Sequence, residues 1–383
     1  MHDACDGYAY IKELEAGNHK ENQNFSDFSD FLEDRAREMG VPLDGQFELT
    51  PLCNFNCKMC YVTMSQDQLC QPLLTPSQWK NLISDACKTG MLRVTLSGGE
   101  CLAYPGFKEV FEHLQSLGCE VEIFTNGALL DKDWISYFVR RTVAGIHITL
   151  YGDSEEAYER VTGQRSFERV LRNIRAVKDA GLPLRINVTP SKFLGEDVFG
   201  TIRLAMEITP NVTVNSGLSA PREETGRNDL DIDLDDETYL RIKKFQNELR
   251  GLHIDPCPAH LMPPEGGDQH EGIFYGVKCG AGRSGFNVDW KGVMSPCNTL
   301  EMIKAYPLED GFDKAWQQIR QAVDQFPRAA ACEGCVYAPI CEPCIGRKSI
   351  YAKAGEWPHV LCERTKHFVE CGAYSLPIME TID

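Results

Sequence analysis

The sequence predicts an α/β fold built on a mostly parallel sheet, followed by a smaller cysteine-rich domain. Between residues 45 and 216, strand-like runs alternate with segments of helical periodicity and give six strand–helix units. Such alternation is typical of parallel strands joined by helices. Beyond residue 251, closely spaced cysteines replace this pattern. We therefore expect an N-terminal helical extension at 1–44, a barrel-like domain with a connector at 45–250, and a cysteine-rich domain at 251–383.

Turn and capping residues set the expected bounds of the elements. The helix after the first strand should begin at the capping box Thr75-Pro76-Ser77-Gln78, with proline at its first position, and end at Gly90. Strands are expected near residues 45–50, 91–96, 120–125, 145–151, 184–189 and 211–214. Helices are expected near residues 26–39, 76–89, 105–117, 131–141, 154–180, 196–208 and 237–249. Six units fall short of the usual eight-stranded barrel.

The two faces of the predicted strands differ in polarity, since alternate strand residues point to opposite faces. One face is apolar and must be covered by the helices: Leu92, Val94, Leu96, Val121, Ile123, Ile146, Ile148, Leu150, Leu184, Ile186 and Val188. The other is polar: Arg93, Thr95, Ser97, Glu120, Glu122, His147, Thr149, Tyr151, Arg185, Asn187 and Thr189. An ordinary barrel carries branched apolar residues there. The polar face therefore predicts a ligand cavity, because a half-exposed sheet fits parallel strands poorly.

Composition narrows the class of protein. The formal net charge of −17 argues against nucleic acid as a partner, since phosphate binding needs a basic surface. Without a long apolar run or a basic, then apolar, N-terminus, we expect neither a membrane span nor a secretory signal, but a cytoplasmic protein. In such a reducing compartment, the 17 cysteines are better explained as metal ligands than as a disulfide framework.

Three thiols follow directly on the first predicted strand. Cys53, Cys57 and Cys60 have the spacing CxxxCxxC, and Pro51 ends the strand so that they lie on a loop. Iron–sulfur clusters are held by cysteine thiolates, and three ligands leave one iron of a [4Fe–4S] cube open for chemistry. The alternative is a structural zinc loop, but a closed zinc site needs four ligands and the next cysteine is Cys70.

This loop resembles the signature of the radical S-adenosylmethionine (SAM) superfamily, CxxxCxφC at the end of the first barrel strand. Met59 stands at φ, where the family usually has an aromatic residue that touches the adenine through its backbone. The resemblance implies a partial (β/α)6 TIM-like barrel in which SAM chelates the open iron. It also implies reductive cleavage of SAM to methionine and a 5′-deoxyadenosyl radical, with electrons from a donor such as flavodoxin or ferredoxin.

Two turns at strand ends lie where barrel active sites are found. Gly98 and Gly99 allow close approach of a ligand to the backbone, and Glu100 offers a carboxylate to an ammonium group. By resemblance this is the family's GGE motif, which holds the amino group of SAM, and Thr125-Asn126-Gly127 is similar to a turn near its ribose. Thr149 and Asn187 could reach SAM or be ordinary polar residues of the cavity. The implied cofactor-binding residues are Met59, Gly98, Gly99, Glu100, Thr125, Asn126, Thr149 and Asn187.

The C-terminal cysteines could form a zinc knuckle if they stood alone, because they include two close pairs. The whole string closely resembles the SPASM domain, which binds auxiliary clusters in radical SAM enzymes that mature peptides and proteins. The last close spacing is shorter by one residue than in the family. The resemblance implies two auxiliary [4Fe–4S] clusters, the first held by Cys279, Cys297 and Cys344 and the second by Cys332, Cys335, Cys341 and Cys362. Cys257 is the candidate fourth ligand of the first, with Cys371 or an open site as alternatives.

Two further segments bear on function. The connector residues Arg222 to Arg227 and the acidic run from Asp229 to Glu237 are expected to be solvated. Asn298 follows Cys297 where the family's sulfatase-maturing members carry an Asp that serves as a base. An amide cannot take that proton, so formylglycine formation is not expected.

Both resemblances together predict an oxidoreductase, with three [4Fe–4S] clusters, that takes a hydrogen atom from a peptide or protein side chain. The expected outcome is a thioether, a carbon–carbon crosslink or a dehydrogenation, as in the maturation of ribosomally made peptides. A radical SAM enzyme acting on a small molecule is one alternative. A non-catalytic metal-binding interaction protein is another. No catalytic side chain is assigned from the sequence.

Overall fold

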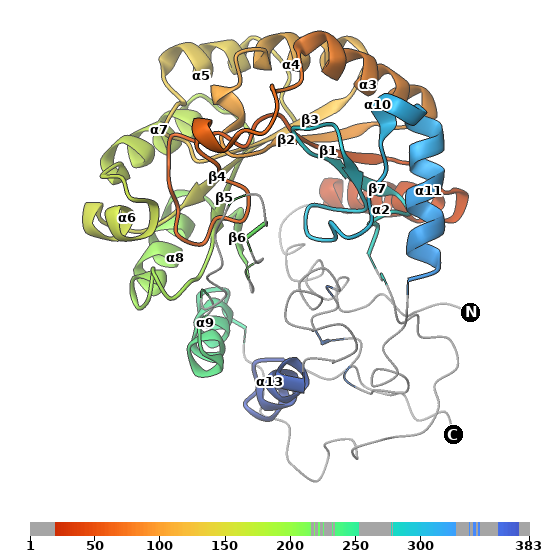
Figure 1. The fold of residues 1–383 in the computed structure, drawn as a ribbon. Helices are drawn as coiled ribbons and strands as arrows, with labels where there is room; N and C mark the ends of the chain where they lie inside the picture. The colour runs from red at the N-terminus through yellow and green to blue at the C-terminus, as the bar shows by residue number, and fades with distance from the viewer. Residues whose placement is uncertain are drawn as a thin grey trace, which may run out of the picture. The chain divides into compact units, whose positions relative to one another are not determined.

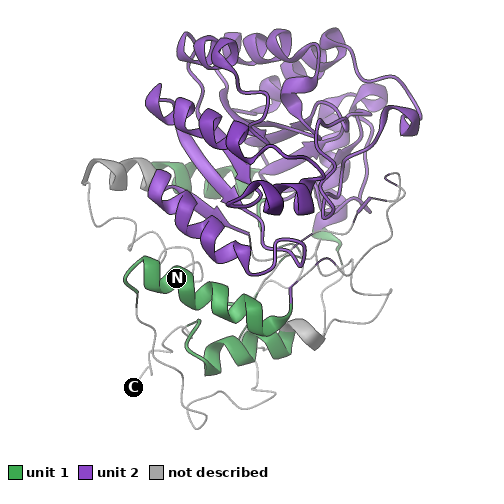
Figure 2. Ribbon diagram, turned by 90° about the vertical axis from the view of Figure 1, so that its left-hand side faces the viewer, with its two compact units in different colours: residues 1–39, 235–280, 324–383 green, residues 40–234, 281–323 purple. Residues whose placement is uncertain are grey.

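The computed structural model describes residues 20–215, 218, 221, 222, 225, 232, 234–252, 277, 279–326, 337, 340, 341, 344 and 359–374. The chain divides into two compact units (Figure 2). Unit 1 takes residues 1–39, 235–280 and 324–383, and unit 2 takes residues 40–234 and 281–323. No helix in the described ranges is long and apolar enough to cross a membrane.

Unit 2 is built on one eight-stranded sheet with the order β6-β5-β4-β3-β2-β1-β7-β8. Its strands are β1 (Asp44–Glu48), β2 (Arg93–Ser97), β3 (Glu120–Thr125), β4 (Gly145–Leu150), β5 (Leu184–Val188), β6 (Val212–Val214), β7 (Gly285–Val288) and β8 (Met294–Ser295). Strands β1 to β6 follow one another in sequence order and pair in parallel. The predicted α/β fold with a partial, six-unit barrel is therefore confirmed.

The helices that connect these strands lie on the outer side of the curved sheet (Figure 1). They are α3 (Pro76–Thr89), α4 (Phe107–Ser116), α5 (Lys132–Val139), α6 (Glu155–Thr162), α7 (Phe167–Asp179) and α8 (Asp197–Ile208). Each buries an apolar stripe, such as Trp79, Leu82 and Ile83 of α3. The first of them begins at the predicted capping box, where the Thr75 hydroxyl accepts a hydrogen bond from the Gln78 amide. Hydrophobic periodicity and capping residues therefore predicted the helices that cover the sheet.

Burial of the strand residues follows the predicted polarity of the two faces. Val94, Leu96, Ile123, Ile146 and Ile186 are all at most 2% exposed. Leu92 was expected among them but is 39% exposed, which corrects that prediction. The reason is that β2 begins only at Arg93, so Leu92 lies before the strand at the end of the sheet. The ligand cavity expected on the polar face stays a prediction.

Strands β7 and β8 extend the barrel sheet beside β1, although they come from the region that the sequence assigns to the cysteine-rich domain. Strand β7 pairs in parallel with β1, with Asp44 opposite Gly285 and Phe47 opposite Val288. Helices α10 (Pro307–Asp310) and α11 (Phe312–Asp324) follow, and the Phe286 ring packs edge-on against Phe47 and Phe312. As a result, residues 281–323 belong to the same compact unit as the barrel.

Unit 1 contains the helices α2 (Lys20–Met39), α9 (Asp236–Leu249) and α13 (His359–Glu370). The last two are joined by an ion pair, in which Arg364 Nε lies 2.6 Å from Asp236 Oδ1. The same guanidinium lies over the ring of Tyr239, 5.1 Å from its centroid. These contacts hold together the helix that carries Cys362 and the helix that follows the connector.

Candidate functional site

The three predicted cluster ligands lie on the loop between β1 and α3. Burial raises the pKa of Tyr151, which follows β4, and Cys57, Cys60 and Cys53 raise it further, so all three thiols lie within electrostatic reach of its hydroxyl. Backbone amides point at two of the sulfurs. The Phe55 amide donates to Cys53 Sγ at 3.4 Å, and the Thr63 amide donates to Cys60 Sγ at 3.3 Å. Such N–H donors favour the thiolate form that iron requires.

The environment of Cys53 fits a ligand that carries positive charge. Burial, together with the neighbouring Glu100 and Cys60, raises the pKa of the Cys53 thiol to about 12. A bare thiolate is therefore unfavourable here, and iron would supply the missing cation. Among the described residues, no three His, Cys, Asp or Glu side chains are close enough to hold a single metal ion. A four-iron cube does not ask for that closeness, because each of its irons takes one thiolate.

Glu100 follows β2 and is completely buried. Its carboxylate accepts hydrogen bonds from Thr125 Oγ1 at 2.8 Å, from the Asn126 amide at 2.9 Å and from the Leu102 amide at 3.1 Å. Burial raises its pKa. No lysine or arginine of the described chain forms an ion pair with it, so a buried carboxylate is held by neutral donors alone. That arrangement suits a cationic ligand group such as the ammonium of SAM.

The two glycines before Glu100 lie against the backbone that leads into the three-thiol loop. Gly98 has a φ of +128°, and a Cβ on it would lie 2.3 Å from the carbonyl oxygen of Thr50. A Cβ on Gly99 would lie 2.5 Å from the carbonyl oxygen of Leu52. The amides of Gly99 and Glu100 donate to these same oxygens, at 2.7 and 2.9 Å. The glycines thus approach the backbone just before the three-thiol loop, which positions Glu100 beside that loop. The expected close approach of a ligand to these glycines stays a prediction.

Asn126 closes the network from the end of β3. Its side-chain amide donates to Asn54 Oδ1 at 2.8 Å and to Cys53 Sγ at 3.5 Å. Its backbone amide and the neighbouring Thr125 hydroxyl bind Glu100. The ends of β1, β2 and β3 are therefore joined around one point, as expected for the carboxyl ends of parallel strands.

The other predicted cofactor residues lie outside this hydrogen-bond network. Met59 is buried in the thiol loop, at 6% exposure. Thr149 and Asn187 face each other across β4 and β5. Within the described chain, neither makes a hydrogen bond to Glu100 or to the turn at Asn126. Their contact with SAM stays a prediction.

The auxiliary-cluster ligands are described only in part. Cys257, Cys332 and Cys335 lie outside the described residues. Cys297 belongs to unit 2, just after β8, and its Sγ lies 3.3 Å from Thr299 Oγ1. The other predicted ligands belong to unit 1: Cys279, Cys341, Cys344 and Cys362, together with the alternative Cys371. Their assignment to two clusters stays a prediction.

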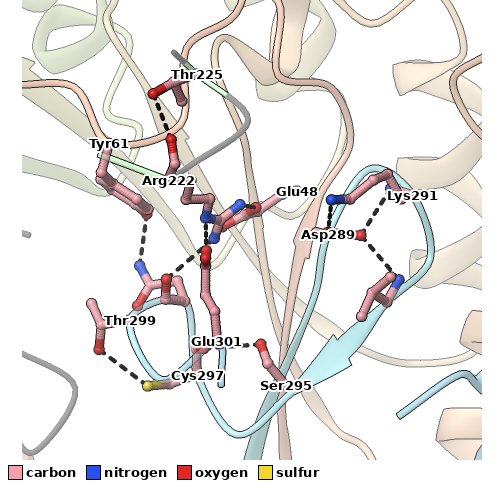
Figure 3. Close-up of polar contacts among 12 residues, drawn as sticks. Glu48, Tyr61, Arg222, Thr225, Asp289, Lys291, Ser295, Cys297, Thr299 and Glu301 are labelled. Atoms are coloured by element: carbon pink, nitrogen blue, oxygen red, sulfur yellow. Dashed lines mark hydrogen bonds and ion pairs between the residues drawn. The ribbon is translucent and has the colours of Figure 1, made fainter. Parts of the chain in front are cut away.

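Sequence reasoning missed Arg222, which was expected to be solvated. Its side chain is 5% exposed and forms two hydrogen bonds with Glu48, at 2.6 and 2.9 Å (Figure 3). Thr225 is buried as well, and its hydroxyl donates to the Arg222 carbonyl. The prediction failed because Glu48 is a buried carboxylate on a central strand and needs a cation. A glutamate within a predicted parallel strand was the available signal that a basic partner exists elsewhere in the chain.

The sequence was compared with protein families and with known proteins. The model of the radical SAM superfamily matches residues 47–199, which include the thiol loop and both turns. A probable GTP 3′,8-cyclase from Saccharolobus islandicus is 30% identical over 234 residues, covering 58% of this chain and 72% of the relative. An AdoMet-dependent heme synthase from Methanosarcina barkeri is 27% identical over 330 residues, covering 81% and 93% respectively.

Similarity also extends to a peptide cyclase and to a solved structure. The PqqA peptide cyclase of Bradyrhizobium diazoefficiens is 24% identical over 285 residues, covering 72% of this chain and 71% of the relative. The crystal structure of Streptococcus suis SuiB superimposes with a TM-score of 0.62 at 17% identity, covering 92% of this chain and 86% of SuiB. This structural likeness concerns the fold.

Proposed function

The chain belongs to the radical SAM superfamily and is an enzyme that uses SAM and a [4Fe–4S] cluster, and we propose that it oxidatively modifies a peptide or protein side chain. The observation that carries the SAM-dependent part of the proposal is the hydrogen-bond network that joins Cys53 to Glu100 through Asn126. A similar SuiB structure contains a bound precursor peptide, SuiA. That structure and the PqqA peptide cyclase support a peptide as the substrate.

Each residue of the network would have a separate task. Cys53, Cys57 and Cys60 would hold the cluster, while Glu100 would bind and orient the ammonium group of SAM. When bound, the cluster and SAM supply reductive cleavage and removal of a hydrogen atom from the substrate. The remaining cofactor contacts would come from Met59, Gly98, Gly99, Thr125, Asn126, Thr149 and Asn187. Because Glu100 is buried, water would be excluded from the bound ammonium, which would strengthen the ion pair.

The cysteine-rich region would complete the oxidation. In this proposal, residues 251–383 carry two auxiliary [4Fe–4S] clusters, with Cys257, Cys279, Cys297 and Cys344 at one and Cys332, Cys335, Cys341 and Cys362 at the other. Residues 45–250 carry the SAM site. After a hydrogen atom has been removed from the substrate, its radical would pass one electron to these clusters and release one proton to solvent, so that the product loses two hydrogen atoms overall. A flavodoxin or ferredoxin would supply the electron for SAM cleavage.

The test is an anaerobic assay with reconstituted enzyme, SAM, a reductant and a short peptide encoded beside the gene. We expect 5′-deoxyadenosine by chromatography and a peptide lighter by two hydrogen atoms by mass spectrometry. The Cys53→Ala variant serves as the control and should yield neither. SAM cleavage without any peptide product, across all peptides encoded nearby, would contradict the proposed substrate class.

A small-molecule substrate is the second candidate. It is favoured by one observation, the similarity over 93% of the length of the AdoMet-dependent heme synthase. The same assay distinguishes the two when a heme precursor replaces the peptide. Loss of hydrogen or carbon from that precursor, with unmodified peptide in the parallel reaction, would assign the enzyme to small-molecule chemistry.

A further inference from the structure

Arg222 lies at the centre of a polar cluster in unit 2 that joins three separate segments (Figure 3). It pairs with Glu48 at the end of β1 through both terminal nitrogens. It also donates to the Asn298 carbonyl at 3.2 Å and forms an ion pair with Glu301. Its backbone amide donates to the Tyr61 carbonyl at 3.0 Å, and its guanidinium lies 5.3 Å from the centre of the Tyr61 ring.

The partners of Arg222 stand next to predicted cluster ligands. Tyr61 follows Cys60 of the three-thiol loop, and Asn298 follows Cys297. The two are joined directly, because the Asn298 side-chain amide donates to the Tyr61 hydroxyl at 2.8 Å. One arginine thus fixes the loop at 297–301 both to β1 and to the end of the three-thiol loop. The contact lies within one compact unit, so it is a property of the barrel itself.

The geometry of these contacts requires an arginine. A guanidinium presents five N–H donors in a rigid fork, so it can bind a carboxylate with two nitrogens and still reach a carbonyl and a second carboxylate. A lysine keeps the charge but cannot hold three such partners in fixed directions. A buried ion pair is weak evidence for added stability, since apolar residues often replace one at little cost. The cluster is better explained by the orientation that it imposes on the 297–301 loop.

We propose that Arg222 is a positioning residue that sets the separation and orientation of Cys297 relative to the three-thiol loop. The inference rests on the proposed function, in which Cys297 holds an auxiliary cluster. Residues that orient a metal ligand without touching the metal commonly change metal affinity or activity by about 10- to 100-fold when they are lost. Loss of Arg222 should therefore change the auxiliary cluster at Cys297 and the yield of product, while the SAM site at Glu100 keeps its own contacts.

Two variants separate positioning from folding. Arg222→Lys keeps a cation beside Glu48 and loses the fork, so the protein should fold. The double variant Glu48→Leu with Arg222→Met replaces the buried pair by apolar side chains of similar size, which should also preserve the fold. It leaves the 297–301 loop without its anchor. Arg165→Lys is the matched control, because Arg165 pairs with Glu156 and Glu159 but is 53% exposed.

The readouts are product formed per SAM cleaved, and the electron paramagnetic resonance spectrum and reduction potential of the auxiliary clusters. We expect Arg222→Lys and the double variant to lower product per SAM by about 10-fold or more and to change the auxiliary-cluster signal, as loss of a ligand-orienting residue does. SAM cleavage itself should stay near that of the parent, and Arg165→Lys should match the parent in every readout.

Unchanged spectra, potentials and product per SAM in both folded variants would overturn the inference. A parent protein that assembles only one cluster would also overturn it, because Cys297 would then bind no cluster and Arg222 would have no cluster ligand to position. A parent that holds all clusters but modifies no peptide refutes only the proposed substrate class. In that case the spectra and potentials of the variants still decide the role of Arg222.

Discussion

The two cysteine-rich regions of this chain differ in how local their assembly is. The three-thiol loop occupies eight consecutive residues, Cys53 to Cys60, and its partners come from the ends of β1, β2 and β3. The later cysteines extend from Cys257 to Cys371, and those that the structure describes are divided between two compact units. The first site is fixed by adjacent strands, whereas the proposed second site would draw its ligands from segments that are far apart in the sequence.

This difference explains why the two sites should fail in different ways. Consecutive parallel strands bring their carboxyl ends together whatever the loops contain, so the first site is largely formed once the sheet folds. A site whose ligands come from distant segments gains more from the metal that ties these segments together, and metal binding then contributes to folding. Loss of ligands should therefore abolish chemistry at the first site and disturb structure at the second.

The largest effect is expected when the three cysteines of the three-thiol loop are removed. Replacing Cys53, Cys57 and Cys60 together by alanine should abolish 5′-deoxyadenosine formation, because no open iron remains to bind SAM. About eight irons per chain should remain if the two auxiliary cubes are present. Iron analysis and an anaerobic cleavage assay measure both quantities. Cys87→Ala, a thiol outside both regions, is the control, and undiminished cleavage by the triple variant would refute the radical SAM assignment of this loop.

Loss of the distant site should have a different signature. Replacing Cys335 and Cys341 by alanine should remove about four irons and lower product formation far more than SAM cleavage, because other residues form the SAM site. Since cluster binding contributes to folding, circular dichroism must first show that the variant keeps its helices. Cys70→Ser is the comparison, since Cys70 is exposed. A folded variant with normal product yield would mean that this cluster has no part in the reaction.

A smaller effect tests the electrostatics of the local site. Because burial raises the pKa of Glu100, the folded protein binds this proton more tightly than the unfolded chain does. Protonated Glu100 therefore contributes its full stability below the pKa that it has in the unfolded chain. This contribution is lost as the pH rises through the raised pKa of the folded state. Glu100→Gln should raise the melting temperature of the ligand-free protein at neutral pH and flatten that pH dependence.

The same substitution should weaken SAM binding about 10- to 100-fold, because it removes a charge-assisted hydrogen bond to the ammonium. Calorimetric titration with SAM and melting curves between pH 4 and 8 separate the two effects. Asp131→Asn offers a control at an exposed helix cap. A variant that melts lower at neutral pH but binds SAM normally would show that Glu100 serves the fold rather than the cofactor.

Features formed by residues close in the sequence could be predicted from it, whereas contacts between residues far apart in the sequence could not. The order of strands and helices, the thiol loop and the turn at Gly98 follow from patterns of a few residues, and these predictions matched the backbone. The pair of Glu48 with Arg222 spans 174 residues, and β7 joins β1 from the far part of the chain. No local pattern encodes such pairings. A buried charge on a strand shows only that a partner is required, not which residue it is.

The smallest expected effect concerns Asn298. This residue follows Cys297 in the sequence and contacts Tyr61, the residue after Cys60. In sulfatase-maturing relatives of the SPASM family this position is a basic Asp, whereas here the Asn298 amide donates to the Tyr61 hydroxyl at 2.8 Å. An amide takes up no proton near neutral pH, so sulfatase-type Cys or Ser peptides should stay free of the aldehyde product in a mass-spectrometric assay.

Asn298→Asp should change SAM cleavage by less than about twofold, since the Tyr61 hydroxyl can turn and donate to the new carboxylate. Asn298→Leu, which cannot hydrogen-bond, distinguishes loss of this contact from the added charge. An aldehyde formed by the unmodified enzyme would show that another group supplies the base, and a collapse of SAM cleavage in Asn298→Asp would show that the 297–301 loop acts on the SAM site itself.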